Sequence, residues 1–219
     1  MAALMASGAK RVLIAAAADT GLLASVARAA AGREIEIRVV DRCETPLELC
    51  RRFARHWSLP VETKIAQLTQ LETDNFDLVY ANSILQFFPA ERRIDVLTQL
   101  RRTLRPGGHL ALVFNTGGGS PKYRSGYAEW VFAELDRQKI QLPDTHEIFR
   151  RRLDDCAREL ETREGVFHDP RVIDLMIEAA GFTIERREQL DMSLTPPLQA
   201  LAEKLTKRRF LTVARSPMT

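Results

Sequence analysis

The sequence predicts a doubly wound α/β protein: a mostly parallel seven-stranded sheet with an antiparallel last strand and helices on both faces. Short β-branched apolar runs alternate with longer amphipathic stretches along the chain of 219 residues. Buried parallel strands joined by helical crossovers produce this alternation. Five such strand–helix units are followed by two further strands, and the right-handed rule for crossovers then places helices on both faces of the sheet.

The predicted strands are apolar runs bounded by turn residues or charges. They cover residues 11–17, 34–40, 61–66, 76–81, 109–114, 182–190 and 209–214. The predicted helices are amphipathic, and many of them begin or end at Asp, Thr, Pro or Gly. They cover residues 21–31, 46–57, 89–104, 126–138, 144–161 and 170–180. The Arg-Pro-Gly-Gly segment at residues 105–108 is expected to form a turn before the fifth strand.

Length and charge predict one globular domain that spans residues 1–219. The net charge of +3 and the 28% of charged residues make no strong case for nucleic acid or a membrane surface as a partner. Short basic runs occur at residues 150–152 and 207–209, with acidic residues nearby. We expect these runs to be solvated helix faces rather than a patch that binds nucleic acid.

The cysteines favour a reduced, cytoplasmic setting. Cys43, Cys50 and Cys156 show neither the C-x-x-C spacing of zinc sites nor clustered histidines, so we expect neither a metal site nor a disulfide. The apolar segment at residues 1–10 is too short for a signal peptide or a membrane span.

Residues 115–169 separate the fifth predicted strand from the helix that begins at Pro170. They contain three consecutive glycines at residues 117–119 and the predicted helices at 126–138 and 144–161. An insertion at the carboxyl edge of an α/β sheet lies over the place where such folds bind ligands. We therefore expect a helical lid that shapes the substrate site, with a plain structural addition as the alternative.

Four segments, taken together, resemble the class I, Rossmann-like, S-adenosylmethionine-dependent methyltransferases. They are RVLIAAAADTGLLASVA, IRVVDRCETPLELC, FDLVYANSILQFFP and RRTLRPGGHLALVF, and they cover residues 11–114. Within that family the chain is similar to small bacterial methyltransferase-like proteins whose second strand ends in the phrase D-x-C-E-T-P-L, as residues 41–47 do. The resemblance implies S-adenosylmethionine as the cofactor.

The resemblance implies a nucleoside-binding site after the second and third strands. Asp41 could accept hydrogen bonds from both ribose hydroxyls, because a carboxylate has two acceptor oxygens; a capping or surface role is the alternative. Arg42 follows it and is assigned to the same site. Gln67 could accept a hydrogen bond from the adenine amino group, with Leu68 packed on the ring, although a solvent-facing loop glutamine is an equal alternative.

The loop after the first strand departs from the family pattern. Alanines occupy residues 15–18, where the family has glycines, and only Gly21 remains. A positive φ costs an alanine roughly 1 kcal/mol. The loop therefore either binds the cofactor through Ala16, Ala18 and Gly21 in a modified shape or has lost binding. Asp19 could accept the cofactor's ammonium group or cap the helix that begins at Gly21.

Polar residues after the fourth and fifth strands mark the place where methyl donor and acceptor meet in this fold. Asn82 and Ser83 are assigned to the cofactor. The acceptor is assigned to Asn115, Tyr123, Tyr127 and His146. The two tyrosines could form an aromatic wall or an ordinary packing face, and the histidine could act as a base or have no chemical role.

The predicted function is methyl transfer to a small-molecule acceptor under the insert. Orientation and exclusion of water supply most of such catalysis, so no catalytic residue is assigned. A base is needed only for a protonated hydroxyl or a weakly acidic carbon. One alternative is a scaffold of this fold that has lost its cofactor and acts as a partner subunit, and a homo-oligomer is also left open. A nicotinamide-dependent oxidoreductase ranks last, because the G-x-G-x-x-G motif is missing.

Overall fold

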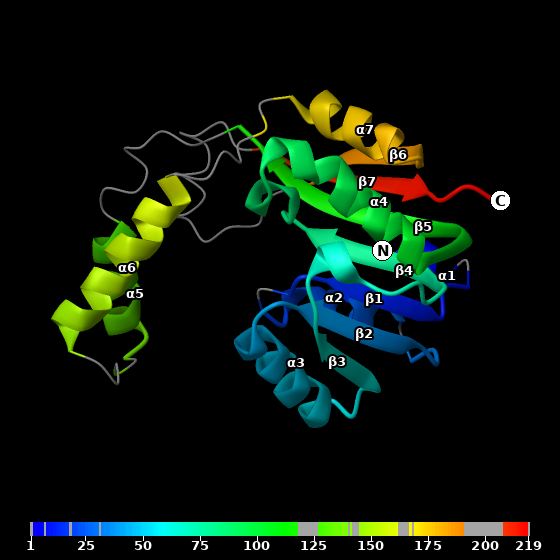
Figure 1. Ribbon diagram of the computed structural model, residues 1–219. Helices are drawn as coiled ribbons and strands as arrows, with labels where there is room; N and C mark the ends of the chain where they lie inside the picture. The colour runs from blue at the N-terminus through cyan, green and yellow to red at the C-terminus, as the bar shows by residue number, and fades with distance from the viewer. Residues whose placement is uncertain are drawn as a thin grey trace.

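A seven-stranded sheet with the order β3-β2-β1-β4-β5-β7-β6 forms the centre of the protein (Figure 1). The structure is a computed structural model, and it describes residues 2–6, 8–17, 19–30, 32–117, 127–139, 141, 145–161, 167, 169–190 and 208–218. The strands are β1 (Arg11–Ala15), β2 (Glu36–Asp41), β3 (Val61–Ile65), β4 (Phe76–Asn82), β5 (Leu104–Thr116), β6 (Thr183–Leu190) and β7 (Arg208–Arg215).

The pairing of the strands confirms the predicted topology. The five strands from β1 to β5 are parallel, whereas β7 runs antiparallel to both β5 and β6. The strand order reverses between β1 and β4, and in doubly wound sheets ligands bind at the carboxyl ends of the strands beside such a reversal. A ligand site is therefore expected beside the loops after β1, β2 and β4.

Helices cover both faces of the sheet, as predicted (Figure 1). They are α1 (Ala2–Ala6), α2 (Gly21–Ala30), α3 (Glu44–His56), α4 (Arg93–Thr103), α5 (Tyr127–Arg137), α6 (His146–Glu161) and α7 (Pro170–Ala179), with short 3₁₀ turns η1 (Leu68–Gln70), η2 (Leu85–Phe87) and η3 (Ala90–Arg92). Leu23 and Leu47 from α2 and α3 join the core on one face, while Leu97 and Ile173 from α4 and α7 join it on the other.

The expected turn at residues 105–108 is instead part of β5, so this prediction was wrong. Leu104 already pairs with Phe76 of β4, and the register shifts before the next pair, Leu78 with His109. Gly107 has a φ of +71°, and a Cβ on Gly108 would lie 2.9 Å from the backbone oxygen of Phe76. The two glycines therefore allow an irregular strand where local propensity predicts a loop.

Asp77 joins β4 to the start of β1. Its Oδ2 accepts hydrogen bonds from the backbone amides of Lys10 and Arg11, each at 2.8 Å, and its Oδ1 accepts one from Arg105. Burial raises the pKa of this carboxyl group, but the hydrogen bonds from Arg11, Lys10 and Arg105 outweigh it. The net result is a pKa below the ordinary aspartate value.

We expect Asp77→Asn to lower the free energy of unfolding at pH 7 by about 2 kcal/mol, because hydrogen bonds to a charged acceptor contribute about 1.5–3 kcal/mol. A depressed pKa stabilises the fold above the unfolded value of about 4 and loses this effect as pH falls through the folded value. Urea unfolding from pH 7 down to pH 3 should therefore show the two proteins converging. Asp95→Asn, which removes an exposed partner of Arg92, is the control and should change little. A constant difference across this pH range would contradict the assignment.

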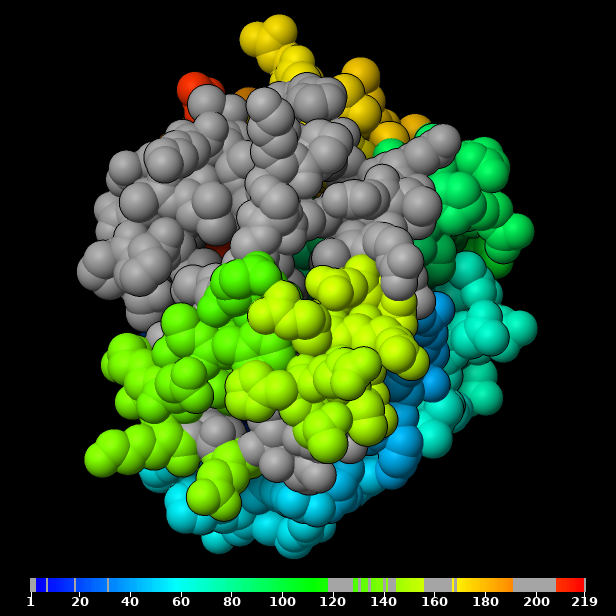
Figure 2. Space-filling view, turned by 90° about the vertical axis from the view of Figure 1, so that its left-hand side faces the viewer, coloured from blue at the N-terminus to red at the C-terminus, as the bar shows by residue number. Residues whose placement is uncertain are grey.

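Helices α5 and α6 pack against each other and lie beyond the carboxyl ends of β1, β4 and β5 (Figure 1). In Figure 2, which looks at this edge of the molecule, the two helices stand in front of the sheet. The Phe132 ring stacks on His146 at a centroid distance of 4.5 Å, and Arg150 pairs with Glu129 at 2.6 Å. Both helices lie within the predicted insert, and their role as a lid stays a prediction. In the described parts of the chain, no helix combines the length and the apolar character needed to cross a membrane.

Candidate functional site

A cleft of about 310 Å³ lies at the carboxyl ends of the strands beside the reversal of strand order. Its size is within the range of about 300–1,000 Å³ that is usual for small-molecule sites. The lining residues come from the last residues of β2 and β4 and from the loops after β1, β2, β3 and β4. They are Ala16, Asp41, Arg42, Ala66, Gln67, Leu68, Thr69, Asn82, Ile84, Phe87 and Phe88.

Ala16, in the loop after β1, lines the cleft at a sharp turn of the backbone. This alanine has a φ of +62°, and its backbone N–H donates to the Val40 carbonyl at 2.9 Å. Ser83, after β4, is also left-handed, with a φ of +54°, and its N–H donates to the Val113 carbonyl at 2.7 Å. Such strained residues gather at functional sites, where the surrounding structure holds them in place.

Asp41 is the acidic group of the cleft. Its Oδ1 accepts the backbone N–H of Cys43 at 2.8 Å, which fixes the carboxylate at the start of α3. The described residues supply no hydrogen bond to its second oxygen. Asp41 therefore combines a hydrogen bond within the turn before α3 with an oxygen that remains available to a ligand in the cleft.

Apolar side chains form much of the remaining lining, which is called the apolar wall. Leu68, in η1, is buried, and Ile84 lines the cleft together with Phe87 and Phe88 after β4. Gln67 precedes η1 and adds an amide to the lining. The cleft thus combines a carboxylate, amides and an apolar wall, which are the groups that would bind a nucleoside.

Arg93, the first residue of α4, holds the segment between β4 and α4. It is buried, with 7% of its surface exposed, and its Nε donates to the carbonyls of Leu85 at 3.1 Å and Phe88 at 3.0 Å. Its guanidinium lies over the Phe167 ring, 4.7 Å from the centroid. Arg93 therefore connects α4 to the segment that brings Phe87 and Phe88 to the cleft.

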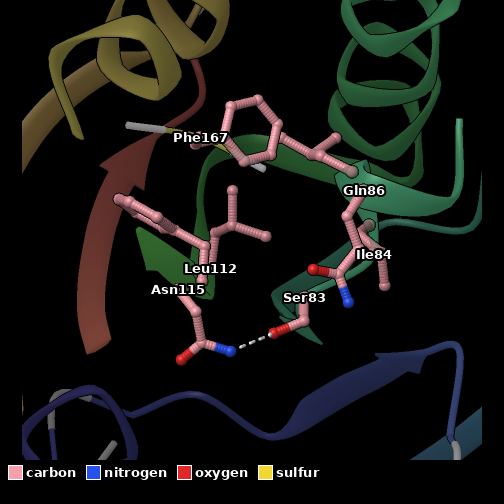
Figure 3. A pocket seen from close by; sticks show the side chains of 8 residues that line it. Ser83, Ile84, Gln86, Leu112, Asn115 and Phe167 are labelled. Carbon is pink, nitrogen blue, oxygen red and sulfur yellow. Dashed lines mark hydrogen bonds between the residues drawn. The ribbon is translucent and has the colours of Figure 1, made fainter. Parts of the chain in front are cut away.

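A second, smaller cavity lies between the ends of β4 and β5 (Figure 3). Asn115 donates through Nδ2 to the Ser83 hydroxyl at 3.3 Å, and that hydroxyl donates to Oδ1 of Asn82 at 3.1 Å. Phe167 closes the opposite side of this cavity, as Figure 3 shows. Because Asn82 also lines the cleft, one hydrogen-bonded chain connects the two cavities.

Comparisons with known proteins agree with this geometry. Residues 13–108 match the family described as "Methyltransferase domain". These residues carry a methyltransferase domain. The match extends from β1 into β5, so this domain contains the four loops that line the cleft. The resemblance seen in the sequence is confirmed.

One curated relative and two solved structures are similar to larger or smaller parts of the chain. The carboxy-S-adenosyl-L-methionine synthase of Ectopseudomonas mendocina is 36% identical over 110 residues, which are 43% of this chain and 44% of that protein. The chain thus spans less than half of the length of that relative. The N-methyltransferase NodS from Bradyrhizobium japonicum, solved with S-adenosyl-L-homocysteine, has a TM-score of 0.59 at 16% identity and covers 97% of this chain and 81% of its own. An S-adenosylmethionine-dependent methyltransferase from Methanosarcina mazei has a TM-score of 0.61 at 15% identity, with coverage of 96% and 94%. The two structures show the shared fold.

The cleft of the methyltransferase domain gathers most of the residues assigned to the cofactor from the sequence. Six of them line it: Ala16, Asp41, Arg42, Gln67, Leu68 and Asn82. Ser83 lies in the smaller cavity instead, and Ala18 is outside the described residues. Asp19 and Gly21 lie at the start of α2, outside the cleft lining, where Asp19 Oδ1 accepts the Gly21 N–H at 2.7 Å and so acts as a cap. The binding role of all these residues stays a prediction.

Of the residues assigned to the acceptor, the structure places Asn115 in the smaller cavity. His146 is exposed and stacks on Phe132 within the α5–α6 pair, and it lines neither of these cavities. Tyr123 lies outside the described residues, and the side chain of Tyr127 is not described. Stacking on Phe132 sets the direction of the His146 ring, and the assignment of His146 to the acceptor stays a prediction.

Two features of the site were missed by the sequence analysis. Thr69 and Phe88 line the cleft although no role was assigned to them, and Phe88 belongs to the Phe-Phe-Pro stretch that follows β4. Arg209 was assigned both to a strand at residues 209–214 and, within the basic run at 207–209, to a solvated helix face. It lies on β7, half-buried, with Nη2 donating to Asn82 Oδ1 at 3.4 Å, so the strand was right and the solvated face was wrong. Only the pairing of β7 with β5 brings it there.

Replacing Ala16 with glycine should increase the free energy of unfolding by about 0.5–1 kcal/mol. The left-handed conformation costs an alanine about 1–2 kcal/mol, and the greater freedom of glycine in the unfolded chain offsets part of the gain. Ala17→Gly is the matched control, because Ala17 is buried without a positive φ and should lose about 1–2 kcal/mol. Urea unfolding of both variants tests this expectation. A loss of stability in the Ala16 variant would contradict it.

Proposed function

We propose that this protein binds S-adenosylmethionine in the cleft and transfers its methyl group to a small-molecule acceptor. The observation that carries the proposal is the convergence of Ala16, Asp41, Gln67 and Asn82, from the carboxyl ends of four different strands, on one cleft within the methyltransferase domain. The carboxy-S-adenosyl-L-methionine synthases among its relatives and the NodS complex with S-adenosyl-L-homocysteine support the choice of cofactor.

The cleft residues fit such a cofactor. Asp41 has one carboxylate oxygen available for ribose hydroxyls, and Gln67 can hydrogen-bond a base edge that packs on Leu68. The left-handed Ala16 lets the β1 loop take the turned shape that glycine usually provides. When bound, S-adenosylmethionine supplies a methyl group already activated by its sulfonium. The residues of this chain then need to orient the acceptor and exclude water, which can lower a barrier by several kcal/mol.

The acceptor is proposed to bind beside Asn82 and Asn115, with α5 and α6 closing over it as a lid. The amide groups of the two asparagines lie at the ends of β4 and β5, and the α5–α6 pair faces this edge of the sheet (Figure 2). A single domain over residues 1–219 and a cytoplasmic, bacterial setting are part of this proposal. The free thiols of Cys43 and Cys50 and the bacterial sources of the curated relatives support that setting.

Calorimetric titration of the purified protein with S-adenosylmethionine and with S-adenosyl-L-homocysteine tests the proposal. Binding at micromolar concentrations is expected, followed by release of S-adenosyl-L-homocysteine when acceptor mixtures are added, measured by mass spectrometry. If neither compound binds, the scaffold interpretation takes its place. If both bind tightly and no acceptor class supports turnover, methyl transfer is wrong although cofactor binding is right.

A further inference from the structure

Arg209 contacts one residue from each of the two cavities. It stands on β7 directly opposite Asn115 of β5, and its guanidinium donates to Asn82. Asn115 lines the smaller cavity and Asn82 lines the cleft. A positive charge is therefore held at the carboxyl edge of the sheet, next to a lining residue of each cavity.

The guanidinium of Arg209 has hydrogen-bonding capacity that the described residues do not use. Its Nε is buried without a hydrogen-bond partner, and its one hydrogen bond to a described residue, Asn82, is long at 3.4 Å. No acidic side chain in the described parts of the chain pairs with it. A buried donor on a charged group is costly when unsatisfied, so native proteins nearly always give it a partner.

The positive charge of Arg209 favours an anionic partner. Burial raises the pKa of the Tyr80 hydroxyl, and the positive charge of Arg209 opposes that rise, so the two groups are close enough to interact. A planar guanidinium matches a carboxylate through two parallel hydrogen bonds. Asn82, Ser83 and Asn115 add neutral groups that can hydrogen-bond the same ligand but contribute no further positive charge. One guanidinium among neutral polar groups fits a singly charged carboxylate better than a doubly charged phosphate.

The position of Arg209 separates it from the nucleoside end of the cleft. In the sheet order, β7 lies two strands beyond β4, whereas β2, which carries Asp41, lies two strands on the other side. With a spacing of about 4.8 Å between neighbouring strands, the two residues lie on strands about 19 Å apart. Arg209 therefore borders the acceptor side of Asn82.

We propose that Arg209 binds a carboxylate group of the methyl acceptor and so selects acidic small molecules as substrates. This inference rests on the proposed function, because it assigns the charge to the acceptor side of a methyl-transfer site. It assigns a substrate class: small molecules that carry a carboxylate close to the group that receives the methyl.

Binding of small carboxylates to the whole chain tests this assignment. Acetate, benzoate and 4-hydroxybenzoate are titrated by calorimetry and ligand-observed NMR against acetamide, benzamide and 4-hydroxybenzamide, with and without saturating S-adenosyl-L-homocysteine. We expect at least one carboxylate to bind better than its amide to the native protein. Arg209→Gln should weaken that binding by about tenfold or more, and Arg209→Lys should restore part of it.

Arg208→Gln is the matched control, because Arg208 is the exposed neighbour on the same strand and its loss changes the net charge equally. Thermal unfolding confirms that each variant is folded. Equal binding of carboxylates to the native protein and to Arg209→Gln, or no binding to either, would overturn the inference. So would weaker binding of S-adenosyl-L-homocysteine alone in Arg209→Gln, which would assign the arginine to the cofactor. If S-adenosyl-L-homocysteine binds none of the proteins, the proposed function fails. The comparison of carboxylates with amides in the absence of S-adenosyl-L-homocysteine still tests Arg209.

Discussion

Asp41→Ala is expected to weaken binding of S-adenosyl-L-homocysteine by about 10- to 150-fold. Hydrogen bonds to a charged acceptor contribute about 1.5–3 kcal/mol, and each 1.4 kcal/mol corresponds to a factor of ten in the dissociation constant. The Asp41 carboxylate lines the cleft at the end of β2 with one oxygen available for ligand hydroxyls. Calorimetric titration of the native and variant proteins measures the change directly.

Two further variants separate a binding role for Asp41 from its role in the turn before α3. Asp41→Asn keeps an oxygen for the Cys43 N–H but loses the charge, so it should remain folded and still bind the ligand more weakly than the native protein. Glu44→Gln removes an exposed acid three residues along the chain that pairs with Arg51, and it should leave affinity unchanged. Native-like affinity in Asp41→Asn would show that the charge of Asp41 does not contribute to binding.

The residues that could be predicted from the sequence share one property: each lies at or just after the end of a parallel strand. Asp41 and Asn82 are the last residues of β2 and β4, Gln67 lies two residues after β3, and parallel strands bring their carboxyl ends to one edge of the sheet. Locating the strands was therefore enough to bring these side chains together. The alanine loop also behaved as the sequence indicated, because Ala16 takes the positive φ that glycine would have adopted more easily.

Other placements depend on contacts that no local pattern contains. Arg209 belongs to a run of three basic residues, a pattern typical of a solvated surface, and only its antiparallel pairing opposite Asn115 sets it beside Asn82. His146 lies in the insert, but its ring direction follows from stacking on Phe132. Residues 105–108 have the composition of a turn, yet pairing with β4 extends β5 through them. In each case a tertiary contact decides what local propensity left open.

Arg93→Ala is expected to lower the free energy of unfolding by about 3–4 kcal/mol. The substitution removes the donor for two carbonyls, those of Leu85 and Phe88, and the cation over the Phe167 ring. Hydrogen bonds from a charged donor contribute about 1.5–3 kcal/mol, a buried cation–π contact about 2 kcal/mol, and the side chain leaves a cavity behind. Urea unfolding measures the loss. Arg92→Ala is the matched control, because this neighbouring arginine is exposed and pairs only weakly with Asp95, and it should change stability by less than about 0.5 kcal/mol.

The same arginine should also affect ligand affinity, because Ile84, Phe87 and Phe88 of the cleft wall belong to the segment that Arg93 holds. Arg93→Lys keeps the charge but has a single nitrogen and no planar fork, so we expect an intermediate loss of stability. At a temperature where this variant is fully folded, S-adenosyl-L-homocysteine should bind it several-fold more weakly than the native protein. A destabilised Arg93→Lys with native affinity would mean that the segment keeps its shape without the arginine. In that case the cleft wall would be formed by the packing of Leu85 and Ile84 in the core, and Arg93 would contribute only to the stability of the fold.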